Sequence, residues 1–115
     1  MYSRMNTIKV KNWHEIPQGY TGFVQTEFGE KIWLKDGNLH REDGPANIFS
    51  NAYERWLLDG KLVWGSTQKL DLTNKIILSK SQHPKYSRVQ IWKILDKDEV
   101  YDLTVIPGME KWIIE

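Results

Sequence analysis

The stretch that decides the fold is Trp33–Leu39, which reads WLKDGNL, because Trp56–Leu62 repeats it as WLLDGKL. The two copies agree at five of seven positions and lie 23 residues apart. A fixed period of this length is typical of stacked supersecondary units. In each copy Asp-Gly stands between segments that bear apolar residues, which is the strongest short-range signal for a two-residue hairpin turn. The repeat therefore predicts a series of β-hairpins.

Two short segments precede each predicted turn, and both read as strands. In the first unit they are Phe23–Thr26 and Gly29–Trp33, and in the second they are Ala46–Phe49 and Ala52–Trp56. The stretch Leu39–Ala46 separates the two units, and its Gly-Pro pair interrupts regular structure. The first half of the chain is therefore predicted to be a β-meander.

The second half of the chain is also predicted to be β-structure. Its segment Lys75–Leu78 contains an apolar run typical of a strand buried on both faces, although Leu70–Ser81 also suits a helix of about three turns. We favour the strand. Further strands are predicted at Arg88–Leu95, at Tyr101–Val105, where apolar and polar residues alternate, and at Lys111–Ile114.

Turn signals separate these later strands. Asp96–Asp98 predicts one turn, and Ile106–Met109 predicts a type II turn because Pro fixes the first central φ and Gly supplies the second, positive one. The fold class is accordingly all-β, or mainly β with at most one short helix. We expect a single domain over residues 1–115, in which residues 12–66 form the repeat hairpins and residues 67–115 form antiparallel strands that complete a shared core.

Composition narrows the class of protein. The 115 residues are 40% hydrophobic and 27% charged, as expected for one globular domain. The net charge of +1 provides no global field toward nucleic acid or an anionic membrane, and the absence of cysteine excludes disulfides and Cys-ligated zinc. No apolar run suits a signal peptide or a membrane helix. We therefore expect a cytoplasmic protein without a membrane partner.

The residues around the first repeat also carry a resemblance to a known family. Asp36–Ala46 reads DGNLHREDGPA and follows Tyr20–Gly22, which reads YTG. This pattern is similar to the MORN-like repeat proteins of tailed, T-even-type bacteriophages, and the resemblance covers roughly residues 12–64. It implies a small accessory protein made during infection in the host cytoplasm, and it implies no catalytic residues. After Leu62 the second unit departs from the pattern, so the array ends after one full and one partial unit.

One group of residues suggests chemistry. His40–Asp43 offers an imidazole, a guanidinium and two carboxylates, which are groups used in acid–base catalysis and metal binding. Contiguous residues of an extended chain point to alternate faces, however, and no second ligand cluster occurs elsewhere in the sequence. We favour a structural role in which His40 and Arg41 close the hairpin by hydrogen bonds. We expect no catalytic residue, metal site or cofactor, and thus no enzyme.

Aromatic residues suggest a binding role. Six Trp, five Tyr and three Phe are many for so short a chain, so they either fill a small core or form a binding face. Trp and Tyr contribute strongly to interface energy, and open sheet edges pair with a partner strand or with a second copy in a homodimer. The predicted partner-binding residues are Trp33, His40, Arg41, Tyr53, Trp56 and Trp64.

A basic stretch provides a second candidate surface. Residues 67–95 contain six Lys or Arg and one Asp, with aromatic residues interleaved, as in proteins that bind single strands. The candidate nucleic-acid-binding residues are Lys80, Lys85, Tyr86 and Arg88. Because residues 96–115 are acidic, ion pairs between neighbouring strands explain the same charges equally well.

These observations favour a binding protein over an enzyme. We expect it to bind and modulate a host protein during phage infection, most concretely as an inhibitor of a host enzyme or of a defence factor. A nucleic-acid-binding protein is the first alternative. An antitoxin or immunity protein is the second, on the similarity of the Asp-Gly-Lys-Leu units to repeat antitoxins.

Overall fold

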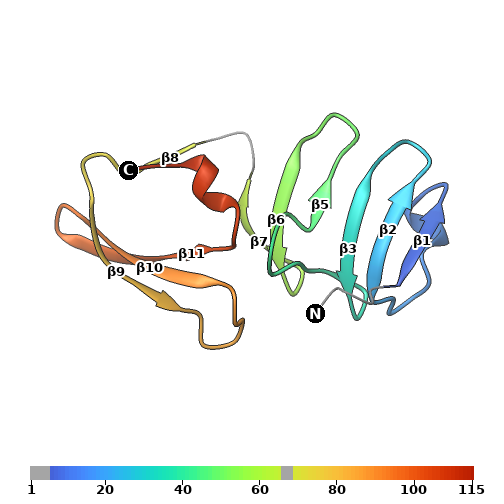
Figure 1. The fold of residues 1–115 in the computed structure, drawn as a ribbon, viewed down its shortest axis with the longest axis horizontal. Helices are drawn as coiled ribbons and strands as arrows, with labels where there is room; N and C mark the ends of the chain where they lie inside the picture. Colours follow the sequence, from blue (N-terminus) through green and yellow to red (C-terminus); the bar gives the residue numbers. More distant parts are fainter. Residues whose placement is uncertain (1–5, 66–68) are drawn as a thin grey trace. The chain divides into compact units, whose positions relative to one another are not determined.

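The computed structural model describes residues 6–65 and 69–115, and within them it contains β-strands and two short 3-10 helices (Figure 1). This confirms the mainly β fold class. The chain divides into two compact units. The first unit comprises Met1–Arg41 and Pro45–Thr67, and the second comprises Glu42–Gly44 and Gln68–Glu115. No helix in the described residues is long and apolar enough to cross a membrane.

The first unit is a single meandering sheet. Its spatial order is β1-β2-β3-β5-β6-β7, with β4 paired to the end of β3. Only β1 and β2 pair in parallel, and the other pairs are antiparallel. The strands are β1 (Thr7–Val10), β2 (Gly22–Thr26), β3 (Lys31–Lys35), β4 (Asn38–Leu39), β5 (Asn47–Ile48), β6 (Glu54–Leu58) and β7 (Lys61–Gly65). The 3-10 helix η1 (Trp13–Glu15) lies between β1 and β2.

The two Asp-Gly pairs form the predicted hairpin turns. The φ angles are 51° at Asp36 and 82° at Gly37, and 50° at Asp59 and 78° at Gly60. Two successive central residues with positive φ define a type I′ turn, whose twist matches that of the flanking strands. Asp tolerates this left-handed conformation and Gly adopts it without a steric penalty. The 23-residue repeat is therefore a repeat of type I′ hairpins.

The first of these turns is held by the residues that precede the repeat. The N–H of Gly37 donates to the carbonyl oxygen of Tyr20 at 2.9 Å, and the N–H of Asp36 donates to Oγ1 of Thr21 at 2.8 Å. One backbone acceptor and one side-chain acceptor thus satisfy the two amides of the turn.

The second turn repeats this arrangement with a histidine in place of the threonine. The N–H of Gly60 donates to the carbonyl oxygen of Leu39, and the N–H of Asp59 donates to Nδ1 of His40, both at 2.8 Å. Nδ1 of His40 also lies 3.3 Å from Oδ1 of the Asp59 carboxylate. The expected hairpin-closing role of His40 is confirmed.

The sequence repeat does not carry this histidine further. Val63 stands 23 residues after His40 and has no side-chain acceptor.

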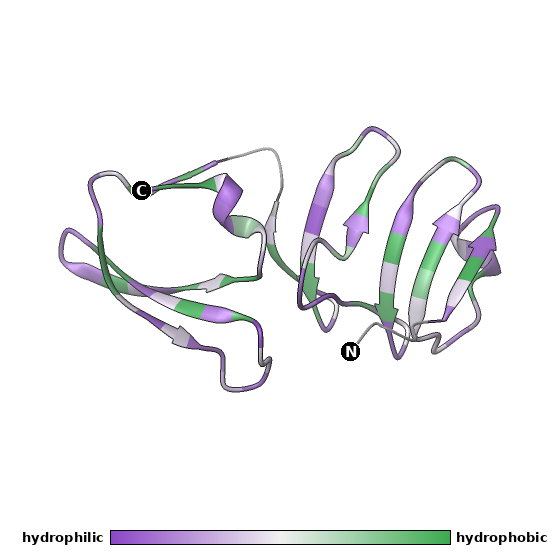
Figure 2. Cartoon of the chain, in the orientation of Figure 1, coloured by the Kyte–Doolittle hydropathy of each residue, from purple (hydrophilic) through white to green (hydrophobic). Residues whose placement is uncertain are grey.

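One hydrophobic cluster of the first unit lies on one face of its sheet. Its buried residues are Val10, Val24, Ile32 and Leu34, and the partly buried residues packed against them are Ile8, Ile16, Tyr20 and Leu39. Figure 2 shows hydrophobic bands on neighbouring strands of this sheet. Alternation along β3 then points Lys31, Trp33 and Lys35 to the opposite face.

The second unit contains a three-stranded antiparallel sheet and a two-stranded parallel ladder. The sheet has the order β11-β10-β9, and β12 pairs with β8. The elements are β8 (Leu70–Asp71), β9 (Ile76–Gln82), β10 (Gln90–Asp96), β11 (Glu99–Val105), the 3-10 helix η2 (Met109–Trp112) and β12 (Ile113–Ile114). Its buried hydrophobic residues are Leu72, Tyr86, Val89, Trp92, Ile94, Val105, Ile106 and Met109.

The structure resolves the choice between strand and helix near residue 76 and corrects one expectation about it. A strand, β9, covers Ile76–Gln82, so the preferred secondary structure is confirmed. The prediction that it is buried on both faces is wrong, because Ile76 and Leu78 are 58% and 48% exposed. The physical reason is that this face of the sheet lacks cover, since Val100, which lies in the same row through Leu95, is also 53% exposed. Thr67 and Gln68 lie outside the described residues.

The end of the chain follows the predicted turn but contains a shorter strand. Gly108 has φ 99° and ψ −17°, and the N–H of Met109 donates to the carbonyl of Ile106 at 2.9 Å, which defines the type II turn. The predicted strand over Lys111–Ile114 is only partly correct, since β12 begins at Ile113. The chain first forms η2, which buries Met109 against the backbone N–H of Ile106.

Candidate binding surfaces

Three of the predicted partner-binding residues lie in the interior. His40, Trp56 and Trp33 are 0%, 1% and 9% exposed. Trp33 pairs with Phe23 across β2 and β3 at a ring distance of 4.8 Å, and Trp56 pairs with Trp64 across β6 and β7. Burial of large rings stabilises a small sheet, so these side chains support the fold from within.

The other three predicted partner-binding residues are partly buried. Arg41 covers Trp33, with its guanidinium carbon 4.0 Å from the ring centroid, and its Nη1 donates to the carbonyl of Pro45 at 3.2 Å. Tyr53 contacts Phe49 at 5.6 Å between ring centroids, and Trp64 is half-buried on β7. Arg41 and Trp33 therefore form one stacked cation–aromatic pair, while Tyr53 makes its ring contact elsewhere in the sheet.

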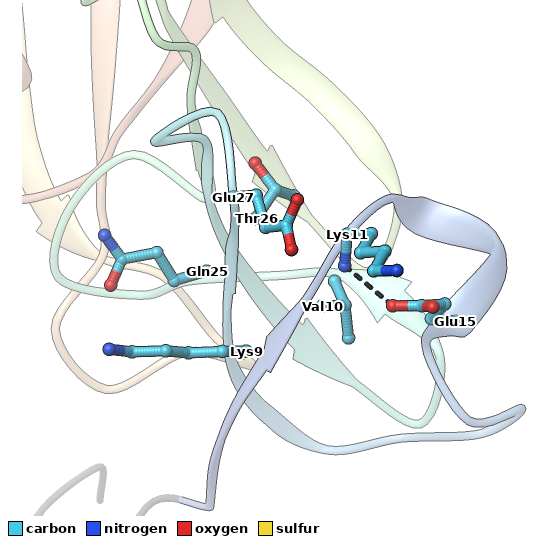
Figure 3. Close-up of a pocket in the computed structure, with 7 residues that line it drawn as sticks. All are labelled: Lys9, Val10, Lys11, Glu15, Gln25, Thr26 and Glu27. Atoms are coloured by element: carbon cyan, nitrogen blue, oxygen red, sulfur yellow. Dashed lines mark hydrogen bonds between the residues drawn. The ribbon is translucent and has the colours of Figure 1, made fainter.

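Register gathers three lysines that are far apart in the sequence. Gln25 pairs with Lys9 on one side and with Lys31 on the other, so these three side chains share a face. Alternation along β3 adds Lys35 to that face. Figure 3 shows Lys9 and Gln25 pointing to the same side, opposite to Val10. All three lysines are exposed.

We call this surface the lysine face; it consists of the exposed Lys9, Lys31 and Lys35 and the partly buried Phe23, Gln25 and Arg41, over the buried ring of Trp33. Within residues 6–65 and 69–115, none of its three ammonium groups makes a hydrogen bond or an ion pair. The row that begins at Lys9 runs through Gln25, Lys31 and Ile48 to Glu54. The Glu27 carboxylate lines a hollow together with Lys9, but no hydrogen bond or ion pair joins the two. The ammonium groups of these lysines thus face solvent. The sequence did not reveal this surface, because its lysines are far apart in the chain.

The basic stretch of the second unit, residues 67–95, differs because most of its cations are paired with carboxylates. Four of its six cations lie within 4.0 Å of a carboxylate. The pairs are Lys75–Asp96 at 4.0 Å, Lys80–Glu115 at 3.8 Å, Arg88–Asp43 at 3.9 Å and Lys93–Asp102 at 3.1 Å. The pairing of Lys93 with Asp102 is the cross-strand contact expected between a basic and an acidic strand.

The predicted nucleic-acid-binding residues also make contacts within the second unit. The Lys80 ammonium also lies 4.0 Å from the Trp92 ring centroid, and Trp92 itself is buried. Tyr86 is buried and its ring contacts His83 at 4.8 Å, while the Lys85 ammonium lies 5.4 Å from the Tyr86 ring centroid. A buried ring offers no platform on which a base could stack. Each of these four residues thus has a contact within the second unit, although Lys80 and Arg88 stay 42% and 53% exposed.

An apolar row crosses the outer face of the same sheet. Leu95 pairs with Val100 on one side and with Ile76 on the other, so the three side chains share a face. Ile76 and Val100 are 58% and 53% exposed, and Leu95 is partly buried. Leu78, also exposed, occupies the bulge that interrupts pairing between β9 and β10. We call these four residues the aliphatic row.

The titration of two groups is shifted by their surroundings. Burial raises the pKa of the Tyr20 hydroxyl, which lies beside the core of the first unit. Hydrogen bonds from the side chain and backbone of Thr73 lower the pKa of the Asp71 carboxyl, which is exposed at the end of β8. Neither group belongs to the lysine face or to the aliphatic row.

A hollow also opens beside β1, as Figure 3 shows, but its chemistry is mixed. Its charged lining consists of Lys9, Lys11, Glu15 and Glu27, and the Glu15 carboxylate accepts a hydrogen bond from the N–H of Lys11 at 2.7 Å. Nowhere in the described part of the chain do three or more His, Asp or Glu side chains gather in a group able to hold a metal ion.

Comparison with known proteins adds no further constraint. No protein-family model matches this chain, and neither a curated protein nor a solved structure matches it. Its function must therefore be inferred from the surfaces described above.

Proposed function

We propose that this protein is a small phage accessory protein that binds a host protein during infection and inhibits it. The observation that carries the binding role is the aliphatic row, in which Ile76, Leu78 and Val100 are each about half exposed. Contiguous apolar residues on an otherwise polar surface are typical of interaction sites.

The chemistry of the row favours a protein over a nucleic acid at this surface. Aliphatic side chains have no aromatic plane for stacking, and the nearby cations Lys75 and Lys93 are already paired with Asp96 and Asp102. Complete burial of a Leu, Ile or Val side chain is worth about 1.5–3 kcal/mol. A few such residues at the centre of an interface can therefore supply its hot spot.

The phage origin rests on the sequence pattern alone. The His of Asp36–Ala46 has a structural part in the fold, because Nδ1 of His40 accepts a hydrogen bond from the N–H of Asp59 in the next hairpin. The residues of this pattern thus connect neighbouring hairpins and supply no catalytic group. This is compatible with a protein that acts by binding.

A pulldown tests the host partner. The tagged protein is incubated with a bacterial lysate beside the double variant Ile76→Lys/Val100→Lys and the charge-matched control Gln18→Lys/Ser50→Lys, whose positions are exposed and outside the row. We expect one dominant host protein with the wild type and the control, and its loss with the row variant. Equal recovery by both variants, or no enriched protein, would contradict the proposal.

Inhibition requires a second measurement. Once the captured protein is identified, its own activity is titrated with the wild type and with Ile76→Lys/Val100→Lys. We expect the wild type to reduce that activity at a one-to-one ratio and the row variant to leave it unchanged. A captured protein whose activity is unaffected would support binding but overturn the inhibitory role.

A further inference from the structure

The lysine face has properties that a protein-binding aliphatic row does not explain. We propose that this face of the first unit binds single-stranded nucleic acid, through phosphate contacts from Lys9, Lys31 and Lys35 and base stacking on Phe23 and Arg41. This activity goes beyond host-protein binding and uses a different unit of the chain.

The spacing of the lysines suits an extended polyanion. Neighbouring strands lie about 4.8 Å apart, so Lys9 and Lys31, two strands apart, have Cα atoms about 10 Å from each other. Lys31 and Lys35 lie four residues apart along β3, which is about 13 Å. The lysine side chain is a flexible four-carbon stem with a point charge at its end. Three such stems around Gln25 and Phe23 can follow the phosphates of one strand.

The absence of internal partners leaves this charge available. No carboxylate in residues 6–65 and 69–115 is paired with Lys9, Lys31 or Lys35, whereas four cations of the second unit are paired. An unpaired cation gains more from a phosphate than one that must first leave a carboxylate, because no existing pair is lost. Charge complementarity therefore identifies an anionic strand as the occupant.

The rings of the face favour a nucleic acid over an acidic polypeptide. Phe23 is half-buried and lies 4.8 Å from Trp33, whose ring is covered by the Arg41 guanidinium at 4.0 Å. Aromatic rings and guanidinium planes are the groups on which unpaired bases stack. An acidic peptide carries no planar base to use them.

A single strand fits this surface better than a duplex. The major groove of DNA is about 12 Å wide and admits a helix or a two-stranded ribbon. The lysine face spans the three adjacent strands β1, β2 and β3 within a broader sheet, so it cannot enter the groove. The bases of a duplex are stacked on each other and cannot reach Phe23. A strand with unstacked bases can contact both the lysines and the rings.

Fluorescence anisotropy with a labelled 12-nucleotide oligothymidine tests the proposal. Three lysine–phosphate contacts on a single strand correspond to a slope of about −2 when log K is plotted against log salt concentration. We expect wild-type binding with this slope, at least about tenfold weaker binding by Lys9→Gln/Lys31→Gln/Lys35→Gln, and a slope near zero for that variant. The control Lys69→Gln/Lys97→Gln/Lys111→Gln removes the same charge from the second unit and should bind as the wild type does.

Two further arms keep the outcomes distinct. Phe23→Leu preserves apolar volume but removes the ring, so it should weaken oligothymidine binding by about tenfold and leave the salt slope unchanged. Ile76→Lys/Val100→Lys, which abolishes the proposed host-protein contact, should retain oligothymidine binding. Circular dichroism spectra and thermal unfolding that match the wild type establish that each variant is folded.

Several results would overturn the proposal. One is the absence of salt-dependent binding by the wild type, and another is equal weakening by the two triple-lysine variants. Poly-L-glutamate that binds as tightly as oligothymidine, with no effect of Phe23→Leu, would identify an acidic polypeptide as the occupant. Tighter binding of a 12-base-pair duplex would exclude the single strand.

Discussion

Two regions of the molecule are positively charged: the basic stretch of residues 67–95 and the lysine face. They differ in whether their cations are paired with carboxylates. The first is conspicuous in the sequence, yet four of its six cations are paired with carboxylates. The second is inconspicuous, because Lys9, Lys31 and Lys35 are separated in the chain and brought together only by strand register. Charges that are close together in the sequence of a β protein are thus often neutralised by neighbouring strands. Charges that are far apart in the sequence can share one face of the sheet.

Charge reversal on the lysine face should have the largest effect. Lys9→Glu/Lys31→Glu/Lys35→Glu is expected to reduce single-strand affinity by about 100-fold or more, since attraction to phosphate becomes repulsion. Anisotropy titration at low salt measures the change. The matched variant Lys80→Glu/Lys85→Glu/Arg88→Glu should alter the affinity by less than about threefold. A larger effect from the second variant would place the accessible charge in residues 67–95.

Those matched positions have a structural reason to be insensitive. Lys80 contacts Glu115 and the Trp92 ring, and Arg88 contacts Asp43. Their charges are already used within the second unit. Circular dichroism of the matched variant should show whether reversal disturbs the fold, and only a folded protein counts in the comparison.

Loss of the histidine contact should have the next largest effect, on stability. His40→Ala removes the acceptor for the Asp59 N–H and leaves a space at a fully buried position. We expect the free energy of unfolding to fall by about 2–4 kcal/mol, as for the loss of a buried, hydrogen-bonded side chain. Urea denaturation measures it. Thr21→Ala, which removes the equivalent but exposed contact at Asp36, should cost about 1 kcal/mol. Equal costs would contradict the role assigned to His40.

Releasing the paired lysines of the second unit should change the affinity for a single strand by a smaller amount. Asp96→Asn and Asp102→Asn remove the carboxylates that pair with Lys75 and Lys93. The double variant should bind oligothymidine about three- to tenfold more tightly, because the second unit then presents unpaired cations. The charge-matched double variant Asp98→Asn/Glu110→Asn, which touches no described ion pair, should gain less. Identical gains would show that only net charge matters.

The smallest effect concerns pH and the Asp71 carboxyl. Hydrogen bonds from Thr73 lower its pKa in the folded state, so the ionised form stabilises the fold above the unfolded pKa. That stabilisation is lost as the pH falls through the folded pKa. The difference in unfolding free energy between the wild type and Asp71→Asn should therefore be constant above pH 5 and shrink below about pH 4. A difference that grows in acid would contradict this assignment.

Local chemistry made the turns predictable. Asp36-Gly37, Asp59-Gly60 and Pro107-Gly108 each impose a backbone conformation that few other residue pairs allow, so each turn formed where the sequence indicated. The strand at Ile76 was predictable from its apolar run for a similar reason. Its exposure was not, because the elements that pack on a sheet, and not the strand's own residues, decide whether a face is covered.

The binding surfaces were less predictable because they depend on register. Trp33 and Trp56 read as candidate contacts, but cross-strand neighbours cover them. The lysine face required knowledge that Gln25 lies between Lys9 and Lys31, which no local pattern reveals. The antitoxin and homodimer hypotheses stay predictions, and so does a core shared by the repeat hairpins and residues 67–115.

The central claim is that the lysine face, and not the largely ion-paired stretch of residues 67–95, binds the anionic strand. Titration of the ¹⁵N-labelled full-length protein with oligothymidine, followed by amide chemical shifts, tests it most directly. We predict that the largest shifts occur at Lys9, Gln25 and Lys31 and that the amides of β9 and β10 stay unchanged. Shifts concentrated in residues 75–93, with none at the lysine face, would contradict the account.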